Sequence, residues 1–100
     1  EKAYRKYYMH GTSHWLGIDV HDSGAYSKNN TFTKLQPGMV LTVEPGLYFS
    51  KYIDDVPQEL KGIGIRIEDN ILVTKTGNTN LSQKIPKEID AIETMVGKLT

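Results

Sequence analysis

The chain has 100 residues, with 12 Lys and Arg against 12 Asp and Glu, so its formal net charge is zero. This balance argues against the long-range attraction that draws basic proteins to nucleic acids or anionic membranes, and we expect neither partner. Because cysteine is absent, disulfides and thiolate metal sites are excluded, and a reducing compartment, expected to be the cytoplasm, is favoured.

The N-terminal stretch carries Tyr4, Tyr7 and Tyr8 at helical spacing, which predicts the end of a helix over residues 1–9. The length allows at most one small domain, and no signal peptide or membrane-crossing apolar run is present. Since the chain begins at Glu1 without an initiator methionine, we expect it to be a piece of a longer protein.

All three histidines of the chain lie in the next stretch, His10 to Asp22. His10 and His14 have the spacing of a zinc-peptidase HExxH helix, but Gly11 stands where the catalytic glutamate would be. Because Gly11, Thr12 and Ser13 are also poor helix formers, we reject that interpretation.

Alternation beyond His14 predicts a strand with His14, Leu16, Ile18 and Val20 on one face. It would put His21 on the other face, so the two histidines can serve one site only if the chain bulges or turns, and Gly17 is the natural place. The alternative, ordinary surface or core histidines, stays open on spacing alone.

A polar loop is predicted over residues 22–38, followed by an apolar strand over 39–44. Alternation places Thr42 and Glu44 on one face of this strand. Pro45 and Gly46 interrupt it, and residues 47–49 resume it. Glu44 is either an exposed strand-end residue or a buried carboxylate whose charge something compensates.

A surface excursion over residues 50–61 leads to the clearest strand pattern, over 62–73. Ile63, Ile65 and Ile67 define a face that we expect to be buried, while Arg66 and Glu68 share the other face. These two charges are either a surface pair of little energetic value or a catalytic carboxylate with the cation that orients it.

Hairpin chemistry at residues 75–78 predicts a turn and a short strand over 79–81. Apolar residues at helical spacing then predict a helix from Pro86 to about Gly97, which we expect to serve packing alone.

His14, Glu44 and Glu68 are therefore three potential metal ligands on three separate β segments. One nitrogen and two carboxylates suit Mn²⁺, Co²⁺, Fe²⁺ or Zn²⁺ better than copper, and they are unlike a Ca²⁺ loop. A two-metal site would need more acidic residues than are obvious here.

Three ordered motifs carry a resemblance that covers nearly the whole chain: MHGTSHWLGIDVHD, LQPGMVLTVEPGLYF and GIGIRIEDNILVT. Their order and spacing resemble the C-terminal part of an Xaa-Pro aminopeptidase (aminopeptidase P), a pita-bread metallopeptidase related to prolidase and methionine aminopeptidase. The resemblance implies an α+β fold, the C-terminal half of the pita-bread (creatinase/aminopeptidase) fold, with a curved, mostly antiparallel sheet and a C-terminal helix. Residues 1–100 would be a C-terminal fragment of the catalytic domain.

The resemblance also implies a metal site. His14 and Glu44 would bind one ion and Glu68 would bridge two, with Mn²⁺ expected first and Co²⁺ or Zn²⁺ possible. Two further aspartate ligands of the family lie on an upstream strand pair that this chain lacks, so the fragment alone is expected to be inactive.

Four further positions match residues of the family outside the ligand set. His21 would stabilise the tetrahedral intermediate, and His10 would line the substrate pocket near the proline-side residue. Arg66 and Tyr48 would support the metal-binding carboxylates.

The implied activity of the intact protein is metal-assisted hydrolysis of the N-terminal Xaa-Pro bond of peptides with a penultimate proline, by a homo-oligomer. Two alternatives remain: an Xaa-Pro dipeptidase, and a non-catalytic pita-bread module that binds peptides or protein partners.

Overall fold

The computed structural model of the chain describes residues 3–97. In chain order its elements are the 3-10 helix η1 (Ala3–Lys6), strands β1 (Ser27–Lys28), β2 (Thr31–Phe32), β3 (Val40–Val43) and β4 (Gly46–Phe49), the 3-10 helix η2 (Gln58–Leu60), strands β5 (Ile63–Arg66), β6 (Asp69–Val73) and β7 (Asn78–Asn80), and helix α1 (Ile89–Gly97). Among these residues, no helix is both long and apolar enough to cross a bilayer.

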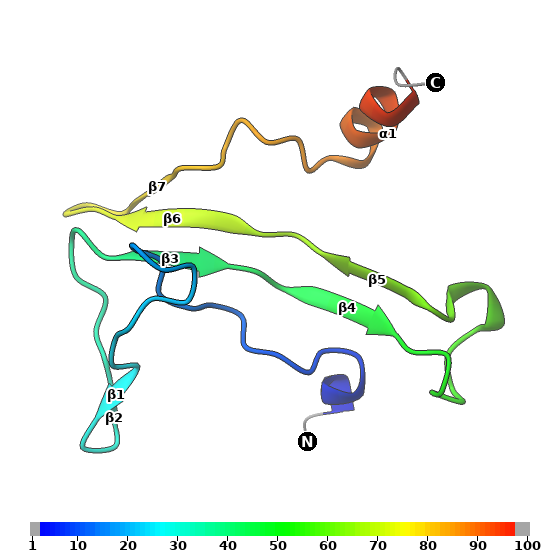
Figure 1. Ribbon diagram of the computed structural model, residues 1–100, viewed down its shortest axis with the longest axis horizontal. Helices are drawn as coiled ribbons and strands as arrows, with labels where there is room; N and C mark the ends of the chain where they lie inside the picture. The colour runs from blue at the N-terminus through cyan, green and yellow to red at the C-terminus, as the bar shows by residue number, and fades with distance from the viewer. Residues whose placement is uncertain (1–2, 98–100) are drawn as a thin grey trace.

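A long antiparallel ribbon forms the body of the structure (Figure 1). Strands β3 and β4 run along one side of it, and β5 and β6 return along the other, so that β4 pairs with β5 and β3 pairs with β6. At the joint between the two pairs, the Ile67 N–H donates to the Pro45 carbonyl at 3.2 Å. Strand β7 pairs with the outer edge of β6, as the hairpin chemistry of residues 75–78 predicts.

The segment around His14 follows the other edge of β3. Trp15 forms an antiparallel bridge with Leu41, and the Thr42 N–H donates to the His14 carbonyl at 2.9 Å. The predicted strand continues only to Leu16, whose N–H donates to the Val40 carbonyl at 3.1 Å. The expectation of a strand through Val20 is therefore wrong, because the chain turns away from β3 after Leu16.

Residues 22–38 contain a short hairpin, β1 and β2, where we predicted a loop. Asn29 and Asn30 connect its strands with positive φ angles of 50° and 59°. Asparagine tolerates this left-handed conformation, which two-residue hairpin turns require. The Asn-Asn pair was the signal in the sequence, but the flanking polar residues gave no strand pattern.

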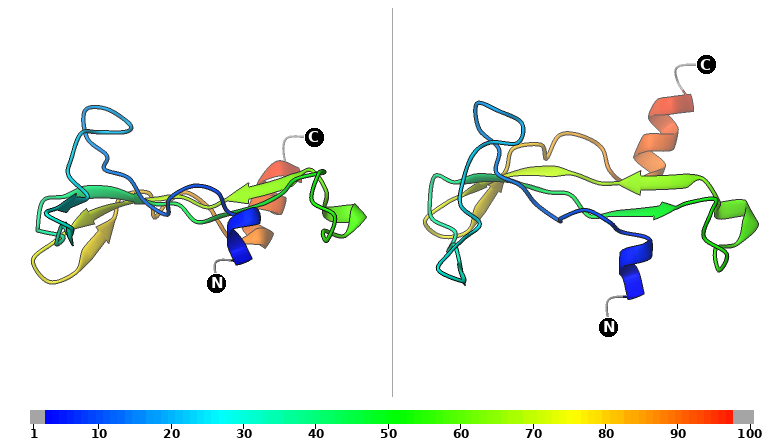
Figure 2. Two further views of the ribbon diagram at one scale, coloured as in Figure 1. Left: turned by 90° about the horizontal axis from the view of Figure 1, so that it is seen from below. Right: turned by 60° about the horizontal axis from the view of Figure 1, so that its bottom comes forward.

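The predicted strand over 62–73 is two strands, β5 and β6, separated by Ile67 and Glu68. Its apolar face is not buried: Ile63, Ile65 and Ile67 are 44%, 62% and 48% exposed. The prediction of a buried face is wrong for the described residues, because the paired strands form a single layer, as the rotated views in Figure 2 show.

The described residues do not enclose a hydrophobic core of their own. Val56 is the sole buried apolar residue among them, and the apolar side chains of α1, such as Ile89 at 74% exposure, do not serve the packing role that we expected. The radius of gyration is 17.1 Å, whereas a compact chain of this length has about 13 Å. The helix itself begins at Ile89, three residues after the predicted Pro86.

Polar contacts attach the N-terminal segment to the connection between β4 and β5. The predicted helix end is the 3-10 helix η1; Glu1 and Lys2 lie outside the described residues. Lys6 forms an ion pair with Asp55, and the Tyr7 hydroxyl donates to the same carboxylate at 3.0 Å. The hydrogen bond to Lys6 lowers the pKa of Asp55 below its ordinary 3.8, and the same bond raises the pKa of Lys6 above 10.5.

These pKa shifts predict a pH window for the attachment of η1. Asp55→Asn should speed local opening of residues 3–8 in the full-length protein, measured as faster hydrogen–deuterium exchange than in the wild type at the same pH. The stabilising effect of the Asp55 carboxylate is fully present above pH 3.8 and is lost as the pH falls through its lowered pKa. The stabilising effect of the Lys6 ammonium is lost as the pH rises through its raised pKa. Asp54→Asn is the matched control, and a difference that persists at pH values well below 3.8 would contradict the assignment.

Candidate metal centre

Glu44 and Glu68 lie opposite each other in the joint of the ribbon. Val43 pairs with Asp69 and Gly46 pairs with Arg66, so each strand has two residues between these pairs. The register therefore continues through the joint without a bulge. Because directly opposed residues of an antiparallel pair point to the same face, both carboxylates project from one side of the sheet.

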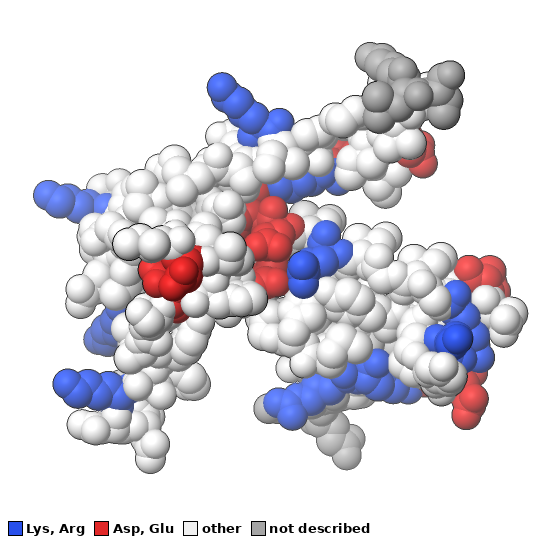
Figure 3. All heavy atoms as spheres, viewed as in Figure 1, with Lys and Arg blue, Asp and Glu red and all other residues white. Residues whose placement is uncertain are grey.

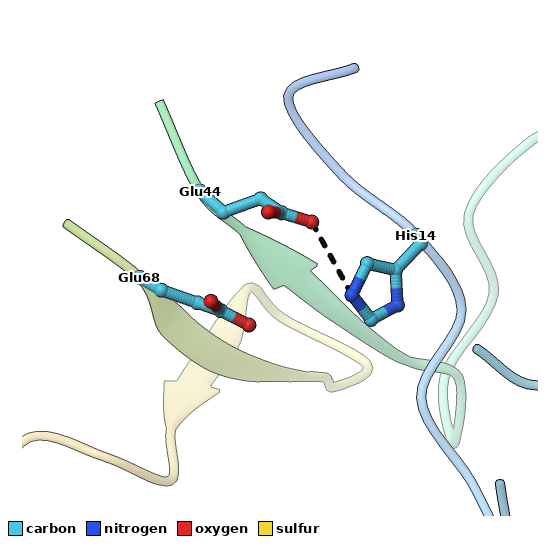
Figure 4. A group of neighbouring side chains, drawn as sticks. All are labelled: His14, Glu44 and Glu68. Carbon is cyan, nitrogen blue, oxygen red and sulfur yellow. Dashed lines mark ion pairs between the residues drawn. The ribbon is translucent and has the colours of Figure 1, made fainter. Parts of the chain in front are cut away.

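Ligand atoms of His14, Glu44 and Glu68 all lie within 4.8 Å of one another. Figure 4 shows the three side chains converging from three separate segments, the N-terminal stretch, the end of β3 and the start of β6. Glu44 is buried. Two opposed carboxylates repel each other, and burial strengthens the repulsion, so the arrangement calls for a compensating cation.

Arg66 supplies part of that compensation. Its Nη1 lies 3.8 Å from Glu44 Oε2, and its Nε lies 3.7 Å from Glu68 Oε2. These distances are ion pairs rather than hydrogen bonds, and the arginine is half exposed, so water screens the attraction. Figure 3 shows acidic atoms near the centre of this face with basic atoms beside them. One screened guanidinium does not neutralise two carboxylates.

His14 presents its Nε2 atom to this pair. Its Nδ1 lies 2.9 Å from the Trp15 carbonyl oxygen, which can only accept, so Nδ1 carries the hydrogen. In the neutral ring Nε2 then has a free lone pair, and it faces Glu44 Oε1 at 3.2 Å. Two lone pairs at this distance repel unless a proton or a metal ion lies between them. A backbone carbonyl on the far nitrogen is the usual partner of a metal-binding histidine.

His21 returns to His14 because the chain turns after Leu16. The Asp22 N–H donates to the Trp15 carbonyl at 3.1 Å, and the two imidazole rings lie 4.4 Å apart, edge to face. A Cβ atom on Gly17 would lie 1.7 Å from Asp22 Oδ2, so a side chain at this position would displace the Asp22 carboxylate. The turn that we expected at Gly17 is present.

Tyr48 and His10 form a second polar pair. The Tyr48 hydroxyl lies 2.7 Å from His10 Nε2, and His10 Nδ1 lies 2.7 Å from the Gly11 carbonyl, which makes the tyrosine the donor to a neutral His10 ring. A Cβ on Gly64 would lie 2.8 Å from the Tyr48 ring, so the absence of a side chain at this position lets the ring pack closely against β5.

The sequence patterns missed two groups of residues at the site. Thr42 is buried between His14 and Glu44, where its hydroxyl contacts both. Asp69, directly after Glu68, accepts hydrogen bonds from the Ser82 hydroxyl at 2.5 Å and from Lys87 at 3.0 Å. The bond from Ser82 lowers the pKa of Asp69. Alternation places Thr42 beside Glu44, but no spacing rule links Thr42 to His14 or Asp69 to Ser82 and Lys87, so only the fold reveals those contacts.

The donor set fits a divalent metal ion. An imidazole nitrogen free of hydrogen and two carboxylates suit Mn²⁺, Co²⁺, Fe²⁺ or Zn²⁺. Such an ion would remove both the carboxylate repulsion and the repulsion between the lone pairs of His14 and Glu44. A bound cation would therefore provide the positive charge that Arg66 alone does not supply to the two carboxylates.

Named proteins are similar to this chain in sequence and in fold. Xaa-Pro aminopeptidase of Haemophilus influenzae is 53% identical over 96 residues, which cover 96% of this chain and 22% of the relative. Aminopeptidase P from E. coli with the inhibitor Pro-Leu has a TM-score of 0.83 at 53% identity, covering 92% of this chain and 20% of that one. Zn-substituted E. coli aminopeptidase P in complex with product has a TM-score of 0.88 at 50% identity, covering 98% and 22%.

The chain thus spans about a fifth of the length of the relatives that it matches. Its antiparallel strands and C-terminal helix agree with the expected part of the pita-bread fold, since the similar structures are aminopeptidases P. The model of metallopeptidase family M24 matches residues 1–75. Three quarters of the chain therefore carry the family's pattern, and the chain belongs to metallopeptidase family M24.

Proposed function

We propose that this chain supplies part of the catalytic centre of a metallo-aminopeptidase that hydrolyses the N-terminal Xaa-Pro bond of peptides. The observation that carries the proposal is the convergence of His14, Glu44 and Glu68 within 4.8 Å. The rest of the catalytic domain would lie in the remainder of the protein, including two aspartates that complete a site for two ions, with Mn²⁺ as the preferred metal.

His14 Nε2, Glu44 and Glu68 would hold the metal, with Glu68 bridging both ions. A bound divalent ion supplies Lewis-acid polarisation of a carbonyl and lowers the pKa of water. The Trp15 carbonyl keeps the hydrogen of His14 on Nδ1, which leaves Nε2 available as the ligand atom. Arg66, between the two carboxylates, would orient them and offset their repulsion.

His21 and His10 would act on the substrate. His21 is exposed beside His14, where its ring can donate a hydrogen bond to the negative charge that develops on the scissile carbonyl oxygen. His10 is oriented by the Tyr48 hydroxyl and would line the pocket for the proline-side residue.

Two facts about the relatives support an aminopeptidase over the alternatives. The relatives described above carry aminopeptidase rather than dipeptidase names, and one is bound to the inhibitor Pro-Leu. A non-catalytic binding module would have no need of the three candidate ligands, which are all retained here. One relative is Zn-substituted, so Zn²⁺ stays beside Mn²⁺ and Co²⁺ as a candidate. A cytoplasmic location and a homo-oligomeric state of the intact protein stay predictions.

The full-length protein should release the first residue from Ala-Pro-Leu, but cleave Ala-Ala-Leu and the dipeptide Ala-Pro poorly. Glu68→Ala should lose both metal ions and lower kcat/KM on the order of 100-fold or more, because a bridging ligand is removed. Elemental analysis and product chromatography measure the two effects. Glu59→Ala, an exposed glutamate of η2, is the matched control. Near-normal turnover by Glu68→Ala would refute the bridging role, and preference for Ala-Pro would indicate a dipeptidase.

His21→Ala should lower kcat by about 10² to 10³ with metal content unchanged, the usual cost of losing one donor to a developing oxyanion. His10→Ala is the comparison, since a residue of the substrate pocket should mainly raise KM. Steady-state kinetics and elemental analysis are measured on the same preparations. Loss of metal from His21→Ala would move this residue into the ligand set.

The hydrogen of His14 should be found on Nδ1. In ¹⁵N-histidine spectra of the full-length protein at alkaline pH, the His14 Nδ1 signal should be that of a protonated nitrogen, because Nδ1 donates to the Trp15 carbonyl. His14→Ala identifies the signal by its disappearance. A hydrogen on Nε2 would remove the proposed ligand atom.

A further inference from the structure

Thr42 is the most deeply buried side chain of the described residues, with 1% of its surface exposed. Val56 is the sole buried apolar residue between Ala3 and Gly97, so burial of a hydroxyl group here needs a physical reason. A buried hydroxyl is costly unless its hydrogen-bonding capacity is used. Both capacities of Thr42 are used, and both connect to candidate metal ligands.

The direction of each hydrogen bond follows from the donors available. The backbone N–H of His14 points at Thr42 Oγ1 at 3.0 Å, and an N–H can only donate, so the hydroxyl oxygen is the acceptor there. The single hydroxyl hydrogen is then free for Glu44 Oε1 at 3.1 Å, where the carboxylate accepts it. One hydroxyl therefore joins the main chain of His14 to the carboxylate of Glu44.

The main chain of Thr42 strengthens this connection, because its own N–H donates to the His14 carbonyl at 2.9 Å. The peptide groups on both sides of the His14 Cα are thus held by one residue. The oxygen that accepts the hydroxyl hydrogen, Glu44 Oε1, is also the atom that faces His14 Nε2 at 3.2 Å. Thr42 consequently holds one candidate ligand atom, Glu44 Oε1, and the main chain that carries the other, on the His14 ring.

We propose that Thr42 is a positioning residue whose hydroxyl sets His14 Nε2 and Glu44 Oε1 at the separation needed to bind a metal ion. The inference rests on the proposed function, in that these two atoms are metal ligands. Threonine is also favoured in strands for its β-branched shape, but valine has the same shape. If the hydroxyl matters, a variant that keeps only the hydroxyl should bind the metal more tightly than a variant that keeps only the shape. If the shape matters, the order of the two affinities is reversed.

The experiment compares Thr42→Val, which keeps the shape and removes the hydroxyl, with Thr42→Ser, which keeps the hydroxyl and removes the methyl group. Mn²⁺ is titrated calorimetrically into the metal-stripped full-length proteins. We expect Thr42→Val to bind Mn²⁺ about 10- to 100-fold more weakly, the usual cost of losing a partner that orients a metal ligand, and Thr42→Ser to stay within about threefold of the wild type. Thr33→Val is the matched control, since the Thr33 hydroxyl donates to the Ala25 carbonyl away from the site.

Two results would overturn the proposal: Thr42→Val that binds Mn²⁺ as the wild type does, or Thr42→Ser that is weakened as much as Thr42→Val. If circular dichroism finds Thr42→Val unfolded, Thr42→Ala replaces it. Alanine and serine both lack the methyl group and differ only in the hydroxyl, so equal Mn²⁺ affinities of Thr42→Ala and Thr42→Ser would again overturn the proposal.

The outcome is separable from that of the proposed function. A wild-type protein that binds Mn²⁺ but leaves Xaa-Pro peptides intact would refute the proposed substrate. The same titrations would still decide the role of Thr42. A wild-type protein that binds no Mn²⁺ would overturn the metal site and this role with it.

Discussion

Repulsion between two carboxylates is the constraint on which the rest of the site depends. Glu44 and Glu68 face each other because the strand register runs unchanged through the joint of the ribbon, and His14 adds a lone pair 3.2 Å from one of them. Such a concentration of negative charge and lone pairs costs free energy in any structure without a cation beside it. Arg66 offsets part of that cost from a half-exposed position, and the remainder is what a divalent ion would relieve.

Backbone hydrogen bonds, rather than a hydrophobic core, position these groups. Among the described residues the buried side chains are mainly polar, namely Thr42, Glu44 and Ser82, with Val56 as the apolar exception. The segment around His14, strand β3 and strand β6 lie side by side and are joined by main-chain bonds. The face that carries Ile63 and Ile65 stays open. The chemistry of this chain is thus arranged by its sheet, while its apolar surface is left for other contacts.

Periodicity in the sequence was enough for relationships within one strand. Alternation put Thr42 and Glu44 on one face, and the hydrogen bond between them confirms it. The opposition of Glu44 and Glu68 could not be derived this way, because register depends on which residues pair across strands. The same limit hid the contact of Asp69 with Ser82. Burial of the isoleucines was predicted from alternation alone, which identifies an apolar face but not whether anything covers it.

The unbroken register limits how this region can change in evolution. Side chains alternate between faces along a strand, so one residue inserted into β5 or deleted from β4 would send Glu68 or Tyr48 to the opposite side of the sheet. Residues gained or lost between Phe49 and Ile63 would not alter that parity, since they lie in the connection outside the paired strands. Homologous chains should therefore vary in length in this connection and keep the count of residues from Gly46 to Phe49 and from Ile63 to Glu68 constant.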